Sequence, residues 1–132
     1  SLLNVFYFDY FDNNYIYWSD SFLDSIIPYS FGLIPPKRIG LEYLGSQLNN
    51  AGNGLVSDGF MNFHFVGIFF NSIVVAGYFC FFKLCQIPSD YFSLFVIVVI
   101  SLIGGSPMSF LLTGGGLLLM ALFLFFIDRS YT

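Results

Sequence analysis

Long uncharged stretches in the second half of the chain predict where helices cross a membrane. No charged residue occurs from Gly59 to Phe82, and none occurs from Tyr91 to Ile127. Because about 20 apolar residues cross a bilayer as a helix, the first stretch fits one span, and the second is too long for one. The sequence GGSPMS, residues 104–109, interrupts the second stretch with glycine and proline. We therefore predict three transmembrane helices, at about 59–82, 89–103 and 108–127.

Residues 1–57 follow a different pattern. The segment FDYFDNNYIYWSDSF places Tyr, Trp and Phe beside Asp and Asn, a mixture that favours the boundary between water and bilayer. We expect an external, aromatic-rich loop on the membrane, with a short amphipathic interfacial helix near Trp18–Ile27 that Pro28 ends. Pro35–Pro36 is expected to form an extended turn, and Gly45 to close the short segment RIGLEYLG. The predicted fold class is all-α, in a polytopic integral membrane protein.

Composition indicates a membrane protein. The orientation of the chain in the membrane is judged from the few lysines and arginines and from the acidic N-terminal segment. The chain is 57% hydrophobic and only 9% charged, with a mean hydropathy of +0.79, whereas soluble domains are roughly one-quarter charged. Lys83 and Arg129 would lie in the cytoplasm under the positive-inside rule, but Lys37 and Arg38 would then lie outside. We place the acidic, aromatic residues 1–57 outside the membrane and the C-terminus in the cytoplasm.

The N-terminal sequence predicts a piece of a larger protein. The chain begins Ser-Leu without methionine, and it shows neither a charged leader region nor a cleavage site of small residues. Three helices with polar inward faces also make a thin bundle. We expect a C-terminal fragment of a polytopic protein whose remaining helices complete the structure. On its own the fragment is expected to be inactive.

Polar residues inside the first predicted span are costly in a membrane, so each one needs a role. Phe60, His64, Gly67 and Asn71 follow an i, i+4, i+7, i+11 pattern, which places them on one stripe of a helix. We expect this stripe to face protein rather than lipid. His64 then has two readings, a ligand-binding or catalytic residue and a hydrogen-bonded packing residue.

The adjacent cations Lys37 and Arg38 follow a rigid pair of prolines. A guanidinium group binds two phosphate oxygens at once, and a nearby lysine adds a point charge, so the pair suits a phosphate or pyrophosphate at the membrane surface. The alternative is contact with lipid headgroups or a salt bridge to Glu42, one helical turn further along.

An asparagine cluster leads into the first predicted span. Asn49, Asn50 and Asn53 offer amide donors and acceptors, and Asp58 adds a carboxylate. Such a set can bind sugar hydroxyl groups. It can equally start a helix, because the side chain of Ser57 or Asp58 can accept hydrogen bonds from the free N–H groups of the first turn.

Four segments in this order resemble a known family. They are YFDNNYIYWSDSFL at 10–23, IGLEYLG at 39–45, NNAGNGLVSDGFMNFHFVGI at 49–68 and SPMSFLLTGGGLLL at 106–119. Together with the membrane pattern, they resemble the C-terminal part of the oligosaccharide repeat-unit polymerases, the O-antigen (Wzy-type) polymerases of bacterial polysaccharide assembly. The resemblance covers nearly the whole chain.

The resemblance implies a glycosyltransferase of the bacterial inner membrane. Such multi-pass polymerases act at the periplasmic face and move a glycan from undecaprenyl pyrophosphate onto a lipid-linked repeat unit. The implied partners are the bilayer, the lipid-linked glycan and the remaining helices of the parent protein. No cofactor, metal or nucleic acid is expected. The candidate residues are Arg38, Glu42 and Asp58 for catalysis and Lys37, Asn49, Asn50, Asn53 and His64 for substrate binding, with Arg38 and Lys37 on the diphosphate and Glu42 or Asp58 as the base.

Two other functions remain open at the level of the sequence. An O-antigen ligase is a related enzyme that passes a finished chain to the lipid A core, but a ligase would have an outer loop richer in Arg and His. A non-enzymatic subunit of a membrane complex would share the abundance of Phe, Tyr, Asn and Ile. Such a subunit would tolerate loss of Lys37 and Arg38, whereas an enzyme would not.

Overall fold

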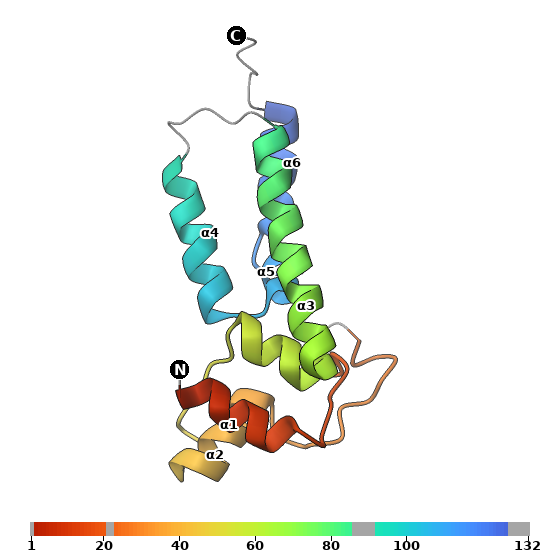
Figure 1. Cartoon of the computed structure of the whole chain (residues 1–132), viewed down its shortest axis with the longest axis vertical. Helices are drawn as coiled ribbons and strands as arrows, with labels where there is room; N and C mark the ends of the chain where they lie inside the picture. Colours follow the sequence, from red (N-terminus) through yellow and green to blue (C-terminus); the bar gives the residue numbers. More distant parts are fainter. Residues whose placement is uncertain (1, 21–22, 86–91, 127–132) are drawn as a thin grey trace.

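The computed structural model describes residues 2–20, 23–85 and 92–126, which form helices joined by irregular segments without a strand among them. The all-α prediction is therefore confirmed. The first two helices lie together at one end of the molecule, and the third extends away from them with the remaining helices at its side (Figure 1). The helices are α1 (Leu2–Phe11), α2 (Pro35–Leu44), α3 (Leu55–Leu84), α4 (Phe92–Gly104), α5 (Pro107–Leu112) and α6 (Gly116–Phe126).

The N-terminal segment is a folded unit that packs on the start of α3. The Tyr7 hydroxyl on α1 donates a hydrogen bond to the Ala51 carbonyl at 2.7 Å. The Ile16 N–H donates to the Met61 carbonyl at 3.1 Å. These bonds join segments distant in sequence around one apolar core, formed by Tyr7, Phe11, Ile16, Ile39, Ala51, Phe60 and Met61.

The short helix predicted near Trp18–Ile27 is wrong for the part of that stretch that the structure describes. Residues 18–20 and 23–27 form turns and a bend, and residues 21–22 lie outside the described residues. Tyr17 and Trp18 have φ angles of 52° and 57°, which a right-handed helix does not allow. The helices lie instead on either side of this segment, in α1 and α2.

The extended turn predicted at Pro35–Pro36 is also wrong, because these prolines begin α2. Proline suits the first turn of a helix, since its φ is already helical and its missing N–H would have no partner there. The predicted end of this segment is confirmed. Gly45 closes α2 with a φ of 72°, and its N–H donates to the Gly40 carbonyl.

The long helix α3 is broken at two residues. Phe63 has φ and ψ of −143° and 27°, and His64 has 57° and −143°. The break divides α3 into a short arm, residues 55–62, and a long arm, residues 65–84. The predicted single stripe of side chains from Phe60 to Asn71 is therefore wrong, because a stripe requires continuous helical geometry across the break.

Two glycines let the arms of α3 meet backbone to backbone. A Cβ atom on Gly67 would lie 2.0 Å from the Gly59 carbonyl oxygen, and one on Gly59 would lie 2.6 Å from the Ile68 nitrogen. No side chain fits at either position without moving the backbone. The fold-back of α3 thus depends on glycine at both sites.

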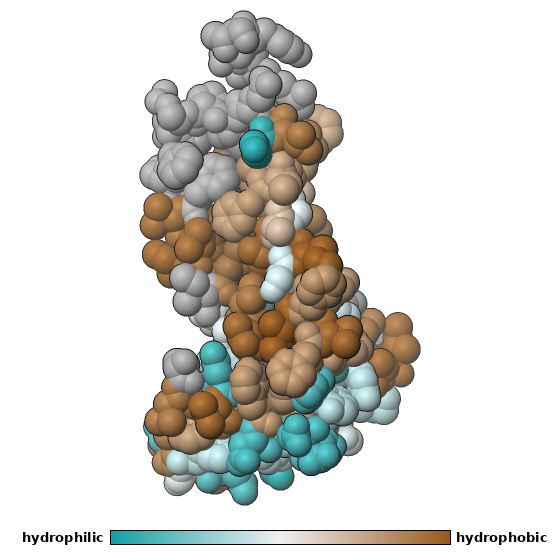
Figure 2. All heavy atoms as spheres, in the orientation of Figure 1, coloured by the Kyte–Doolittle hydropathy of each residue, from teal (hydrophilic) through white to brown (hydrophobic). Residues whose placement is uncertain are grey.

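The long arm of α3 carries the apolar surface of the molecule. Among the described residues, α3 is the one helix long and apolar enough to cross a membrane. Phe65, Val66 and Phe69 on this arm are 65–72% exposed. Hydrophilic residues gather mainly at the end formed by α1 and α2, while the surface along α3 and its neighbours is mostly hydrophobic (Figure 2). The described structure is compatible with membrane association.

The other two predicted spans differ from single long helices. The one at 89–103 corresponds to α4, with residues 89–91 outside the described part of the chain. The one at 108–127 is divided into α5 and α6, because Gly115 at φ 83° turns the chain between them; residue 127 is not described. The C-terminal helices pack on the long arm of α3 through Tyr78, Phe82, Val98, Leu102 and Phe123.

We predict that Gly67→Ala destabilises the protein, because the added methyl group collides with the backbone of Gly59. Overpacking of this kind costs about 1–3 kcal/mol. Gly77→Ala is the matched control, since a Cβ there meets nothing within 4 Å and alanine favours the helix. Thermal unfolding in detergent should show a lower midpoint for Gly67→Ala and an unchanged or higher one for Gly77→Ala. Equal midpoints for the two variants would contradict the close packing of the arms.

Candidate functional site

The site centres on Asp58, a carboxylate on the short arm of α3. Its side chain is buried, with a relative exposure of 2% for the residue. One carboxylate oxygen accepts a hydrogen bond from the Asn53 amide at 3.2 Å, and the other accepts one from the Asn71 amide at 2.9 Å. Asn71 stands on the long arm and also donates to the Leu55 carbonyl at 3.1 Å. Asp58 therefore ties the two arms together.

Burial favours the protonated form of the Asp58 carboxyl group. It raises the pKa of the carboxyl group from 3.8 to about 6, even though hydrogen bonds from Asn71, Ser106 and Asn53 lower it, and the charge of Asp20 raises it further. Amides stabilise a carboxylate less than a cation would, so the desolvation effect prevails. Asp58 is consequently a group that exchanges a proton close to neutral pH.

Asp58 lines a hollow of about 290 Å³ between the N-terminal unit and the C-terminal helices. We call it the polar hollow after its carboxyl, amide and hydroxyl side chains, which share the wall with apolar ones. A second carboxyl group, that of Asp20, shares this hollow, and burial raises its pKa as well. Amide and hydroxyl groups complete the polar part of the wall. The lining residues are Trp18, Asp20, Ile34, Pro36, Asn53, Asp58, Ser106 and Ser109.

This arrangement suits the handling of a hydroxyl group. A carboxylate whose pKa lies near the working pH can accept a proton from a hydroxyl and later return it. Asn53 and Ser106 offer donors and acceptors that can hold neighbouring hydroxyl groups. The hollow can therefore support general acid–base chemistry on a bound hydroxyl group.

Of the predicted site residues, Asn53 and Asp58 lie together, whereas Asn49 and Asn50 lie in the segment after α2. Asn53 hydrogen-bonds Asp58 directly. Asn49 and Asn50 are exposed in the segment after α2, and the Asn49 amide donates to the Leu44 carbonyl at 3.3 Å. Their side chains are not among those that line the hollow.

Asp58 does not cap its helix, contrary to one of the two readings of the sequence. Gly54 is the N-terminal cap of α3, and the Ser57 hydroxyl accepts a hydrogen bond from the Gly54 N–H at 3.0 Å. The carboxylate of Asp58 is directed instead to Asn53 and Asn71. Ser57 alone serves the start of the helix.

The three charged candidates on α2 lie apart from Asp58. The Arg38 Nε donates to the Tyr10 hydroxyl at 2.8 Å, and its guanidinium carbon lies 5.7 Å from the centre of the Tyr10 ring. Lys37 and Glu42 are exposed. None of the three lines the polar hollow, although Pro36, immediately before Lys37, does.

His64 lies at the break of α3 rather than on a helical face. Its Nε2 is 3.5 Å from a carboxylate oxygen of Asp12, and its side chain is 33% exposed. It borders a second hollow, of about 350 Å³, together with Tyr15, Tyr17, Phe63 and Val66.

Sequence reasoning did not assign a role to Asp20, Ser106 or Asn71 in the site. Asp20 belongs to the WSD segment and Ser106 to the SPMS segment, both already part of the resemblance. A buried carboxylate needs several hydrogen-bond donors, so the search for partners of Asp58 could have pointed to Asn71. The hydroxyl of Ser106 carried no signal of its own.

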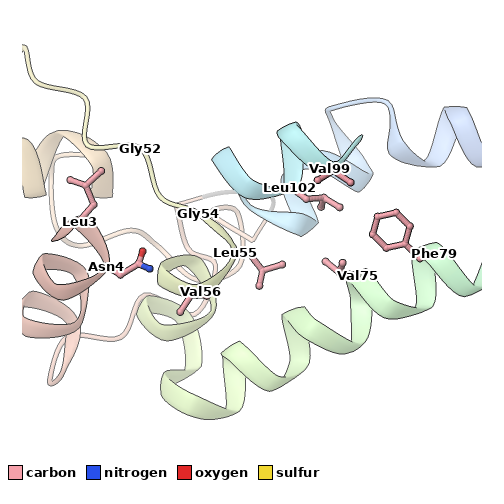
Figure 3. Close-up of a pocket in the computed structure, with 10 residues that line it drawn as sticks. All are labelled: Leu3, Asn4, Gly52, Gly54, Leu55, Val56, Val75, Phe79, Val99 and Leu102. Atoms are coloured by element: carbon pink, nitrogen blue, oxygen red, sulfur yellow. The ribbon is translucent and has the colours of Figure 1, made fainter. Parts of the chain in front are cut away.

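Figure 3 shows an apolar cavity of about 590 Å³. It shares the segment 52–58 with the polar hollow, because Gly54 and Leu55 line the cavity whereas Asn53 and Asp58 line the hollow. Side chains from α1, the short arm of α3, its long arm and α4 surround the cavity, and none of them is titratable. Such a cavity suits a hydrocarbon group. Its lining residues are Leu3, Asn4, Gly52, Gly54, Leu55, Val56, Val75, Phe79, Val99 and Leu102.

Comparisons with known proteins found no matching family model, no similar curated protein and no similar solved structure.

We predict that Asp58 makes folding stability depend on pH. Its folded-state pKa of about 6 exceeds the ordinary 3.8. At a pH between these two values the folded chain therefore keeps a proton on Asp58 that the unfolded chain releases. The resulting stabilisation, about 2–3 kcal/mol, is fully present below about pH 4 and is lost as the pH rises through 6. Thermal unfolding in detergent from pH 4 to 7 should show a steeper decline for the wild type than for Asp58→Asn.

The exposed Asp24 provides the control for this measurement. Asp24→Asn removes the same formal charge, and it should keep the pH dependence of the wild type. Parallel curves for Asp58→Asn and the wild type would show that Asp58 titrates alike in the folded and unfolded chain.

Proposed function

We propose that the chain is the C-terminal part of a membrane glycan polymerase. This enzyme would transfer a growing glycan from undecaprenyl pyrophosphate onto a lipid-linked repeat unit, in O-antigen or capsule assembly. The observation that carries the proposal is the buried Asp58 in a polar hollow beside an apolar helix. The type of reaction is inferred from the four sequence segments, which occur in the same order as in the polymerases that they resemble.

Asp58 has the properties of the general base in this reaction. The bond between the first carbon of the donor sugar and the pyrophosphate oxygen breaks, and the pyrophosphate leaves with the electron pair. The acceptor hydroxyl oxygen forms the new glycosidic bond to that carbon, and its proton passes to Asp58. Asn53 and Ser106 are placed to hold hydroxyl groups beside the carboxylate, and Asn71 fixes its orientation.

Lys37 and Arg38 are the proposed contacts of the diphosphate. They follow Pro36, which lines the hollow, in the first turn of α2. The bond from Arg38 to Tyr10 and the packing of its guanidinium on that ring hold the side chain in one orientation. An oriented guanidinium binds phosphate oxygens with less loss of conformational freedom. Glu42 is exposed on the same helix, which makes Asp58 the better candidate for the base.

The apolar parts of the structure suit a lipid-linked substrate. The proposal places the long arm of α3, α4 and the α5–α6 pair in the bacterial inner membrane as three spans. The N-terminal unit and the short arm of α3, which carries Asp58, would lie on the periplasmic side, and the C-terminus in the cytoplasm. The apolar cavity next to the polar hollow, walled by Leu55, Val75 and Leu102 among others (Figure 3), would take part of the polyprenyl chain. The diphosphate would then lie near the boundary between the two.

The test is complementation of a strain that lacks its own polymerase and makes the matched repeat unit. The parent protein containing this chain should restore a polysaccharide ladder on a gel. Asp58→Asn should reduce the ladder to single repeat units, a loss of about 10²-fold or more for removal of a general base. Asp24→Asn should leave it intact. Membrane levels of each variant are measured by immunoblot, so that loss of protein is not mistaken for loss of activity.

Two results would reject the proposal. Without a ladder from the wild-type parent, the ligase or the structural subunit becomes the better account. A full ladder from Asp58→Asn at normal protein level would show that the carboxylate is not the base.

Arg38→Ala tests the diphosphate contact in the same strain. Loss of the guanidinium should shorten or abolish the ladder, because the leaving diphosphate would lose a charge-assisted hydrogen bond. Lys83→Ala is the control, since Lys83 is an exposed cation at the far end of α3. If Arg38→Ala and Lys83→Ala give ladders like that of the wild type, the diphosphate must be bound elsewhere.

A further inference from the structure

The hollow at the break of α3 is walled by aromatic rings from two segments. Tyr15 and Tyr17 come from the segment after α1, and Phe63 and His64 come from the break itself. The ring centres of Tyr17 and Phe63 are 5.5 Å apart, and those of Tyr15 and His64 are 6.0 Å apart. The hollow has a volume of about 350 Å³ and opens widely to the surface, so it offers its aromatic wall to one side of a ligand and does not enclose it.

The backbone around this hollow is strained. Tyr17, Trp18 and His64 have positive φ angles of 52°, 57° and 57°, and they are the residues other than glycine with positive φ in the described part of the chain. Positive φ is unfavourable for residues other than glycine, and strain of this kind persists where the surroundings fix it, often at ligand sites. Two of these residues, Tyr17 and Trp18, pack their rings against Phe63 in the same region.

Polar groups stand at the edge of the aromatic wall. The His64 Nε2 lies 3.5 Å from a carboxylate oxygen of Asp12, and both side chains remain partly exposed, at 33% and 61%. The Tyr15 hydroxyl donates to the Asp12 carbonyl at 2.9 Å and so fixes the ring beside this pair. Imidazole and carboxylate can donate to and accept from hydroxyl groups.

Ring faces next to such polar groups match the chemistry of a sugar. One face of a pyranose ring presents C–H groups, which pack on the negative face of an aromatic ring. Its hydroxyl groups, at the rim, need hydrogen-bond partners of both kinds. Aromatic residues that only anchor a protein at the bilayer surface need no concave wall and no paired imidazole and carboxylate.

We propose that the hollow formed by Tyr15, Tyr17, Phe63 and His64 binds one sugar ring of the glycan substrate. The inference rests on the proposed function, because that function supplies a glycan. Trp18 connects the two sites. Its ring packs against Phe63 with centres 4.8 Å apart, and the same residue lines the hollow that contains Asp58. A glycan bound here can thus extend over Trp18 toward the carboxylate.

Trp18 also provides the measurement, since it is the single tryptophan of the chain. The 132-residue chain, purified in detergent, is titrated with the repeat-unit oligosaccharide released by mild acid from a strain that lacks its polymerase. The tryptophan fluorescence should change saturably. Tyr17→Ala should weaken binding at least about tenfold, whereas Tyr17→Phe, which keeps the ring, should stay within about threefold.

Phe69→Ala is the control, because Phe69 is an exposed aromatic residue on the long arm of α3 outside the hollow. It should bind the oligosaccharide like the wild type. The inference is overturned if the wild type shows no saturable change, or if Tyr17→Ala binds as well as Tyr17→Phe. It is likewise overturned if Tyr17→Ala alters only the quenching of Trp18 by brominated lipid in phosphatidylethanolamine–phosphatidylglycerol vesicles, since that result assigns the rings to the bilayer surface.

The titration and the complementation can fail separately. Oligosaccharide binding that depends on Tyr17, from a chain whose parent protein restores no ladder, supports the sugar site and rejects the polymerase. A restored ladder without such binding supports the polymerase and rejects the sugar site.

Discussion

The contact between the two arms of α3 determines most of what this chain can do. Gly59 and Gly67 bring the backbones together, and the hydrogen bond from Asn71 to Asp58 spans the same junction. With larger residues at the glycines the amide could not reach the carboxylate, and without that amide Asp58 would be buried with one donor fewer. A single junction therefore fixes both the fold-back and the position of the acidic group.

The same junction positions the N-terminal unit. The Asn62 amide oxygen, in the last turn before the break, accepts a hydrogen bond from the Trp18 N–H, and the Met61 carbonyl accepts one from the Ile16 N–H. The short arm thus pairs with an irregular segment that has no helix to satisfy its backbone. This pairing places Trp18 between the polar hollow and the aromatic one. Both hollows therefore depend on the position of the break, because Trp18 lines the polar hollow and Phe63 and His64 line the aromatic one.

The sequence was sufficient for the features that local chemistry controls. The all-α class, the end of α2 at Gly45 and the nearness of Asn53 to Asp58 follow from composition, glycine chemistry and short separation along the chain. The break at Phe63 and His64 could not be predicted, because the uncharged run from Gly59 to Phe82 contains no proline. Contacts from distant residues meet the chain just before the break, where the Met61 carbonyl and the Asn62 amide oxygen accept hydrogen bonds from the backbone N–H groups of Ile16 and Trp18. The link from Asp58 to Asn71 depends on that break and was hidden for the same reason.

The surroundings of Asp58 argue for chemistry rather than for stability alone. A neutral side chain of similar shape could hold two helices together without the cost of burying a carboxyl group. Asp58 has amide and hydroxyl partners, and these leave its pKa near 6. A fold that keeps a carboxyl group poised near neutrality, at the wall of a polar hollow, keeps a group that can move a proton.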